Sequence, residues 1–203
     1  MKNVYSKFLS NARGAIFGID ARIAIAIFAA LSVTAGYYAL GRIEQIRNAS
    51  IMKELAAVEN AMIQMQTDMG IFYQQSIAES NGRDDFQALW NSNYINSRFQ
   101  RLWNGPYINE ETTNHSILGT YYITYYRNDM SPCENKGDCH AFIAISETPT
   151  KIWNYINDYV DGNVGESPES IKTAHLSGKI RAISLIEPRT LLYKAVSRKT
   201  RRY

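Results

Sequence analysis

The chain has 203 residues, of which 45% are hydrophobic and 20% are charged, and its formal net charge at pH 7 is +3. This length suffices for one domain with a substantial core in addition to a membrane segment. The small net charge and the absence of a basic, aromatic-rich helix argue against a nucleic-acid partner. No phosphate loop, dinucleotide fingerprint or Gly-x-Ser-x-Gly elbow is present, so we predict no enzyme, no catalytic residues and no cofactor.

The first predicted element is a membrane-spanning helix. The 19 residues Ile23–Gly41 carry no formal charge, and a helix of that length reaches about 28 Å, close to the thickness of a bilayer's hydrocarbon core. Lys and Arg dominate the preceding segment, which marks the cytoplasmic side. We therefore expect a cytoplasmic basic leader at residues 1–22 and a transmembrane helix at 23–41. A cleaved secretory signal, which usually has a shorter apolar core, and a buried core helix are the alternatives.

The second predicted element is an amphipathic continuation of this helix over residues 42–76. From Ile51 onward, hydrophobic residues recur at alternating intervals of four and three positions, which places them on one narrow face. The polar residues between them, including Glu54, Glu59 and Asp68, are predicted to face solvent. We expect the apolar face to pack on the protein's own sheet, although a coiled coil has the same spacing. This predicted helix–sheet seam consists of Ile51, Leu55, Val58, Met62, Met65, Met69 and Phe72.

Residues 77–203 are predicted to form a globular domain outside the cytoplasm. Short helices are expected near residues 85–90 and 151–160, because their apolar residues recur at helical spacing. The fold class is α+β, with the long N-terminal helix packed on a C-terminal antiparallel sheet of about four strands. The strands are predicted at residues 119–127, 140–146, 180–186 and 191–196, from runs rich in β-branched and aromatic residues.

The two cysteines, Cys133 and Cys139, enclose five residues between two of the predicted strands. On the translocated side of a membrane, such a pair indicates a disulfide across a tight loop. Closing so short a loop stabilises by only about 2 kcal/mol, so the bond would mainly fix the shape of the loop. A metal site built with His140 and His115 is the alternative, but this spacing matches no zinc pattern. No metal site is therefore predicted here.

Several short segments are informative because of their order along the chain. Phe86–Leu89 precedes Trp103–Ile108, which contains Gly-Pro-Tyr. Val160–Asn163, which contains Asp-Gly-Asn, precedes Ser177–Arg181, which contains Gly-Lys-Ile-Arg. Together with the helix from Ile19 to about Gln75, this order resembles the type IV pilin and type II secretion pseudopilin family, in particular its major pseudopilins. The resemblance implies an N-terminal helix that anchors the subunit and later assembles it into a filament.

The family's leader peptide is cut after a glycine, and the mature chain then carries a Glu at its fifth position. Here a cut after Gly14 gives a mature start at Ala15 and places an acid, Asp20, at the sixth position; a cut after Gly18 fits the pattern less well. The resemblance assigns leader processing and assembly to Gly14, Asp20 and Arg22. Asp20 would pair with a neighbouring subunit's amine or with Arg22, because an unpaired carboxylate at the edge of hydrocarbon is costly. An ordinary interfacial charge is the alternative for Asp20.

The resemblance also implies a location and partners. It predicts a single-pass protein of the bacterial inner membrane, with a cytoplasmic N-terminus and a periplasmic or extracellular C-terminal domain. The implied partners are copies of itself or homologous pilin-like subunits, the secretion or pilus assembly machinery, membrane lipid and a prepilin peptidase. The alternative functions are a single-pass envelope protein whose outer domain binds a ligand or partner without polymerising, and a membrane-tethered enzyme.

Major pseudopilins often hold calcium in a C-terminal loop, and hard oxygen ligands occur in this chain as well. Asp158, Asp161, Asn163, Glu166 and Glu169 lie on a loop that contains glycine. Their spacing is not that of a helix–loop–helix calcium site. A solvated acidic loop is therefore the expected interpretation, and calcium is the alternative.

Overall fold

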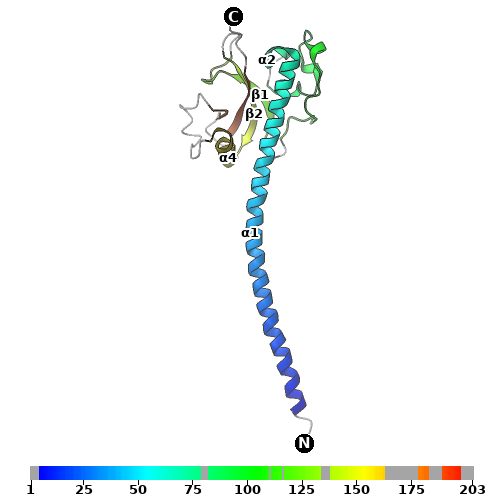
Figure 1. Cartoon of the computed structure of the whole chain (residues 1–203), viewed down its shortest axis with the longest axis vertical. Helices are drawn as coiled ribbons and strands as arrows, with labels where there is room; N and C mark the ends of the chain where they lie inside the picture. Colours follow the sequence, from blue (N-terminus) through cyan, green and yellow to red (C-terminus); the bar gives the residue numbers. More distant parts are fainter. Residues whose placement is uncertain are drawn as a thin grey trace. The chain divides into compact units, whose positions relative to one another are not determined.

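The computed structural model describes residues 5–78, 82–109, 111–115, 117–133, 138–162, 178–182 and 189–197. Within the first of these ranges, only the backbone of residues 5–17 is described. Its contacts divide the chain into two units, Met1–Arg47 and Asn48–Tyr203, which are described separately. The elements labelled in Figure 1 and those between them are α1 (Tyr5–Met69), α2 (Tyr73–Ser76), α3 (Arg83–Gln87), η1 (Ser92–Tyr94), η2 (Gln100–Leu102), β1 (Tyr121–Tyr126), β2 (His140–Thr148), α4 (Thr150–Asp161), β3 (Ile180–Ala182) and β4 (Arg189–Ser197).

Helix α1 contains both predicted helical segments without an interruption at Gly36 or Gly41. It is long and apolar enough to cross a membrane, and the apolar stretch is not buried within the protein. The helix ends at Met69, whereas the sequence pattern predicted an end near residue 76. Gly70 adopts a left-handed conformation with φ of 67°, and its N–H donates to the carbonyl of Gln66 at 3.0 Å. Glycine adopts this conformation without steric cost, so it terminates the helix.

The sheet belongs to the second unit and is fully antiparallel, with strand order β1-β2-β4-β3. Strand β2 is central and pairs Ile143 with Ile123 of β1 and with Tyr193 of β4. Helix α4 follows β2, and the chain then forms the edge strand β3 before β4 returns between β2 and β3. The predicted α+β class with four antiparallel strands is confirmed, although residues 183–186 of the third predicted strand lie outside the described residues.

The core of the second unit lies between the C-terminal part of α1 and one face of the sheet. All seven predicted seam residues are buried, and they share a single cluster with inward-facing strand residues such as Ile123, Ile143 and Leu191. Figure 1 shows this part of α1 beside β1 and β2. Phe72 is buried after α1 has ended, at the residue that precedes α2. Fully burying an Ile, Leu or Met side chain contributes about 1.5–3 kcal/mol, so this cluster is the main attachment of helix to sheet.

The opposite face of the sheet has a smaller cluster formed by Phe142, Ala144 and Leu192. Successive strand residues point to opposite faces, so these residues alternate with those of the main core. Tyr122, Tyr126 and Met130 pack against this cluster. Large side chains therefore cover both faces of β1, as its alternating sequence predicted.

Candidate functional site

The first candidate site is the apolar part of α1, described here within the first unit. Every described residue from Gly18 to Ile43 is exposed, and Phe28 and Leu31 are 72% and 62% exposed. The Thr34 hydroxyl donates to the carbonyl of Leu31 at 2.9 Å, so this polar side chain is satisfied by its own helix. A segment with this composition and exposure suits a hydrocarbon environment or another apolar helix. It is a candidate membrane span, as predicted.

The residues predicted for processing and assembly all belong to α1. Gly14 lies in the part of the helix whose backbone alone is described, and Asp20 and Arg22 are both exposed. Residues two positions apart on a helix point in different directions, so the structure does not bring Arg22 to Asp20.

The second candidate site is a set of carboxylates on the C-terminal part of α1 that contact the rest of the second unit. Glu54, Glu59 and Asp68 each accept a hydrogen bond from a tyrosine elsewhere in the second unit, and we call these three contacts the tyrosine–acid contacts. Asp68 is exposed, as predicted, but the prediction that Glu59 faces solvent is wrong, because its side chain is only 17% exposed, and Glu54 is likewise only partly exposed. The donors are Tyr121 for Glu54 at 3.3 Å, Tyr193 for Glu59 at 2.6 Å and Tyr107 for Asp68 at 3.0 Å.

Glu54 also lies next to a buried histidine. Nδ1 of His115 accepts hydrogen bonds from the backbone N–H groups of Ile117 and Leu118, both at 3.0 Å. A neutral imidazole has one donor and one acceptor nitrogen, so its hydrogen is on Nε2. That nitrogen lies 3.2 Å from Oε2 of Glu54. His115 thus positions a loop against α1.

Glu59 is the centre of a three-residue cluster. Nζ of Lys179 donates to Oε1 of Glu59 at 2.8 Å and to the Tyr193 hydroxyl at 3.2 Å. Burial raises the pKa of Tyr193, and its hydrogen bond to Glu59 raises it further. Burial alone would lower the pKa of Lys179, but the hydrogen bonds to Glu59 and Tyr193 outweigh it, so the pKa is raised. The cluster joins α1 to β4 and to the residue before β3.

The structure brings together the two segments of the first quoted motif pair. Nε1 of Trp103 donates to the carbonyl of Ala88 at 3.0 Å, and the N–H of Tyr107 donates to the carbonyl of Leu89 at 2.7 Å. A side chain at Gly105 would collide with the Trp103 ring, so only glycine fits there. Because Tyr107 also donates to Asp68, this motif pair holds the end of α1.

The second motif pair is also joined in space. The carboxylate of Asp161, the last residue of α4, accepts the N–H groups of Lys179 and Ile180 at 2.8 and 2.9 Å. A Cβ at Gly178 would collide with the same carboxylate, so a larger residue there would displace Asp161 from this position. Since Lys179 contacts Glu59, the second motif pair holds α1 as well. The sequence contained both pairs, but not their contacts with the helix.

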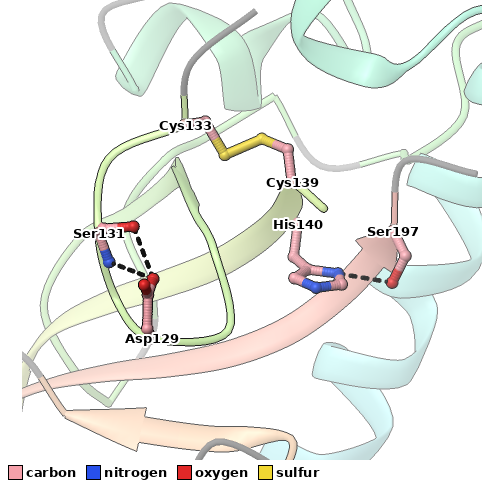
Figure 2. The surroundings of a disulfide bond; sticks show 6 residues. All are labelled: Asp129, Ser131, Cys133, Cys139, His140 and Ser197. Atoms are coloured by element: carbon pink, nitrogen blue, oxygen red, sulfur yellow. Dashed lines mark hydrogen bonds between the residues drawn. A yellow bond between two sulfur atoms is a disulfide. The ribbon is translucent and has the colours of Figure 1, made fainter. Parts of the chain in front are cut away.

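The disulfide between Cys133 and Cys139 is present, with the two Cα atoms 5.6 Å apart, as predicted. Figure 2 shows it where the loop enters β2, next to His140, whose Nδ1 lies 2.8 Å from the hydroxyl of Ser197 on β4. In the loop before Cys133, Asp129 accepts hydrogen bonds from the backbone and hydroxyl of Ser131. His140 therefore pairs with β4 in this arrangement instead of forming a metal site with the sulfurs.

The predicted calcium alternative lies mostly outside the described residues, which do not include Asn163, Glu166 or Glu169. Asp161 is occupied by two backbone N–H groups. Within the part of the chain that the structure describes, no group of three or more His, Cys, Asp or Glu residues could hold a metal ion.

Three comparisons with known proteins were made for the whole chain. No protein-family model, no curated protein and no solved structure matches it.

Proposed function

We propose that this protein is a pilin-like or pseudopilin-like subunit of a bacterial type II secretion or type IV pilus filament, assembled through its N-terminal helix. The observation that supports the proposal most is that one helix, α1, contains an exposed apolar segment followed by a segment buried under a four-stranded antiparallel sheet. The resemblance to the family, stated above from its motifs, agrees with this arrangement. The expected location is the bacterial inner membrane, with the N-terminus in the cytoplasm.

A membrane anchor alone does not account for all of the exposed apolar residues. Ile43 and Ile46 follow the charged Arg42 and are 60% and 69% exposed. They lie beyond the uncharged segment, where lipid headgroups and water would replace hydrocarbon tails. Apolar side chains at this level are better covered by helices of neighbouring subunits than by lipid.

The proposed mechanism is an exchange of lipid contacts for contacts with other subunits. The span carries seven large apolar side chains that are at least half exposed: Ile23, Ile25, Ile27, Phe28, Leu31, Val33 and Leu40. Leaving them in water would cost on the order of 10 kcal/mol. A filament in which the helices bundle would bury them again as the subunit leaves the membrane. The expected partners are therefore copies of this chain or homologous subunits, together with the machinery that extracts them and a prepilin peptidase.

The first test is mass spectrometry of the mature N-terminus in the native membrane. A start at Ala15 or Ile19, in particular a methylated one, supports the filament subunit. The second test replaces Asp20 with Ala and measures incorporation into sheared filaments. The expected result is normal membrane insertion with lost incorporation, whereas the Glu111→Ala control, at an exposed position of the domain, should assemble normally. Normal incorporation of the Asp20 variant would remove the assembly role of that residue.

One observation favours the alternative, a single-pass envelope protein with a ligand-binding outer domain. A groove of about 310 Å³ lies beside α1 and is lined by residues that include Glu54, Phe86, Tyr107, Thr112 and Tyr121. This volume is at the lower end of the range for small-molecule sites. An unprocessed Met1, together with a membrane-resident population that never enters sheared material, would favour this alternative.

A further inference from the structure

The groove beside α1 has one wall on the helix and a base of stacked aromatic rings. Glu54, Ala57 and Val58 of α1 line it, and their spacing of three and four positions places them on one face of the helix. The rings of Phe86 on α3 and Tyr121 on β1 also line the groove, and they are stacked with their centroids 4.9 Å apart. Both side chains are almost fully buried, so they form the base of the groove.

The remaining lining residues lie between η2 and β1 in the sequence. Tyr107 and Ile108 are half-buried and provide an aromatic ring and an apolar side chain. Asn109 and Thr112 are exposed, so they lie at the rim of the groove, and their side chains contain neutral oxygen acceptors. The groove therefore combines apolar and aromatic walls with a few polar groups, as sites for small molecules do.

Glu54 is the charged residue of this groove. Of the described residues that line it, Glu54 alone has a charged side chain. This side chain is 34% exposed, so a solute in the groove can reach the carboxylate. The contacts with Tyr121 and His115 both involve Oε2, at 3.3 and 3.2 Å. Oε1 accepts no hydrogen bond from the residues that the structure describes, so it is the oxygen that is open to a ligand.

The negative charge of Glu54 is not balanced by the neighbouring histidine. Nδ1 of His115 accepts two backbone N–H groups, so the imidazole carries its hydrogen on Nε2 and is neutral. Apolar surroundings strengthen the attraction between Glu54 and a cation, because water screens it less than at an open surface. Aromatic rings add a further attraction for cations through their faces. The charge of the groove thus selects a cationic ligand and disfavours an anionic one.

We propose that this groove binds a small organic cation, namely a protonated amine with an apolar substituent. The ammonium group donates to Oε1 of Glu54, and Asn109 and Thr112 supply further acceptor oxygens at the rim. The substituent lies against the apolar side chains of Val58 and Ile108. This ligand class belongs to the alternative function described above. The site is also independent of filament assembly, because every lining residue belongs to the second unit.

The test compares three ligands of similar shape and different charge: benzylamine, benzyl alcohol and benzoate. Their binding to the full-length protein in a non-ionic detergent is measured by calorimetry at neutral pH, and a titration into protein-free micelles is subtracted. We expect benzylamine to bind about tenfold more tightly than benzyl alcohol, because only its ammonium group forms a charge-assisted hydrogen bond with Glu54. Benzoate should bind more weakly than either. Saturable binding of benzylamine that is no tighter than that of benzyl alcohol, or no saturable binding of benzylamine, would overturn the proposal.

A Glu54→Gln variant tests the charge itself. Glutamine removes the charge but keeps an oxygen that can accept the hydrogen bond from Tyr121. This variant should lose the preference for benzylamine, while its affinity for benzyl alcohol stays close to that of the wild type. The Glu147→Gln control, at an exposed position outside the groove, should keep the preference. If Glu54→Gln keeps the preference as well, Glu54 does not bind the ammonium group and the proposal is wrong.

A second pair of variants tests the place of binding and remains informative if Glu54→Gln does not fold. Ala57 is an exposed residue on the groove wall, and Ala56 is an exposed neighbour that does not line the groove. Ala57→Leu should fill part of the groove and weaken benzylamine binding about tenfold, because a packed site tolerates added volume poorly. Ala56→Leu should bind like the wild type. Equal binding by the two leucine variants would place the amine elsewhere and refute the proposed site. None of these measurements requires filament assembly, so their failure is distinct from a failure of filament incorporation.

Discussion

Removing the Tyr193 hydroxyl is predicted to weaken the attachment of α1 to the sheet. This hydroxyl donates to Glu59 at 2.6 Å, and a hydrogen bond to a charged group contributes about 1.5–3 kcal/mol. Lys179 contributes less to the same cluster, below about 1 kcal/mol, because its side chain is 45% exposed and solvent screens the ion pair. We therefore expect Tyr193→Phe to lower the free energy of unfolding by about 1.5–2 kcal/mol. Tyr159→Phe, at a 69% exposed position, is the control.

The assay is urea unfolding of the full-length protein, followed by the fluorescence of its three tryptophans, all of which lie in the second unit. A double-mutant cycle of Tyr193→Phe with Glu59→Gln isolates the contact, and we expect a coupling energy of about 1 kcal/mol or more. Additive effects of the two substitutions would refute the reasoning, as would equal destabilisation by Tyr193→Phe and the Tyr159 control.

The contact should also depend on alkaline pH in a defined direction. Burial, and then Glu59, raise the pKa of Tyr193 above its ordinary value of 10.0. Its proton therefore contributes stability that is fully present below pH 10 and is lost as the pH rises through the raised pKa of the folded state. The stability difference between wild type and Tyr193→Phe should be constant near neutral pH and should shrink in alkali. A difference that grows with pH would contradict the assignment.

Three further predictions concern the seam, the end of α1 and the loop. Met62→Ala should lower the free energy of unfolding by about 2–5 kcal/mol because Met62 is fully buried, whereas Ile63→Ala at a 45% exposed position should lower it far less. Similar urea midpoints for the two variants would contradict the assignment of Met62 to the core. Burial, with a further contribution from Asp68, raises the pKa of Tyr107 to about 12, so the difference in phenolate absorbance between wild type and Tyr107→Phe should develop mainly above pH 10. Replacing Cys133 and Cys139 with Ser should lower the free energy of unfolding by about 2 kcal/mol, and a loss of all structure would show a larger role for the disulfide.

The elements of this fold that depend on local periodicity could be predicted from the sequence. The alternating spacing from Ile51 onward identified a buried helix face, because the period of an α-helix places such residues in one line. The same pattern misplaced the end of the helix, because Phe72 continues the spacing and is buried with the seam although the helix has already ended at Met69. The signal for this end was Gly70, whose φ is positive. A conformational signal in the backbone therefore outweighed the hydrophobic pattern.

The tyrosine–acid contacts could not be predicted, because their partners lie far apart along the chain. The separations are 39 residues for Asp68 and Tyr107, 67 for Glu54 and Tyr121, and 134 for Glu59 and Tyr193. From the sequence alone, an acid between apolar helix positions belongs to a solvated side, since nothing local indicates a donor. The strand order that brings Tyr193 to α1 was likewise not contained in the pattern of individual strands.

The chemistry of these contacts suits the proposed function, in which the subunit would move from a membrane into a filament. Phenol donors are neutral, so their hydrogen bonds to Glu54, Glu59 and Asp68 depend less on ionic strength than ion pairs between exposed charges. If α1 is pulled out of the bilayer, the force reaches the sheet through the buried seam and through these three contacts. Helix and sheet should then stay joined at salt concentrations that screen Lys179. We therefore expect high salt to remove the effect of a Lys179→Met substitution on stability while leaving the effect of Tyr193→Phe intact.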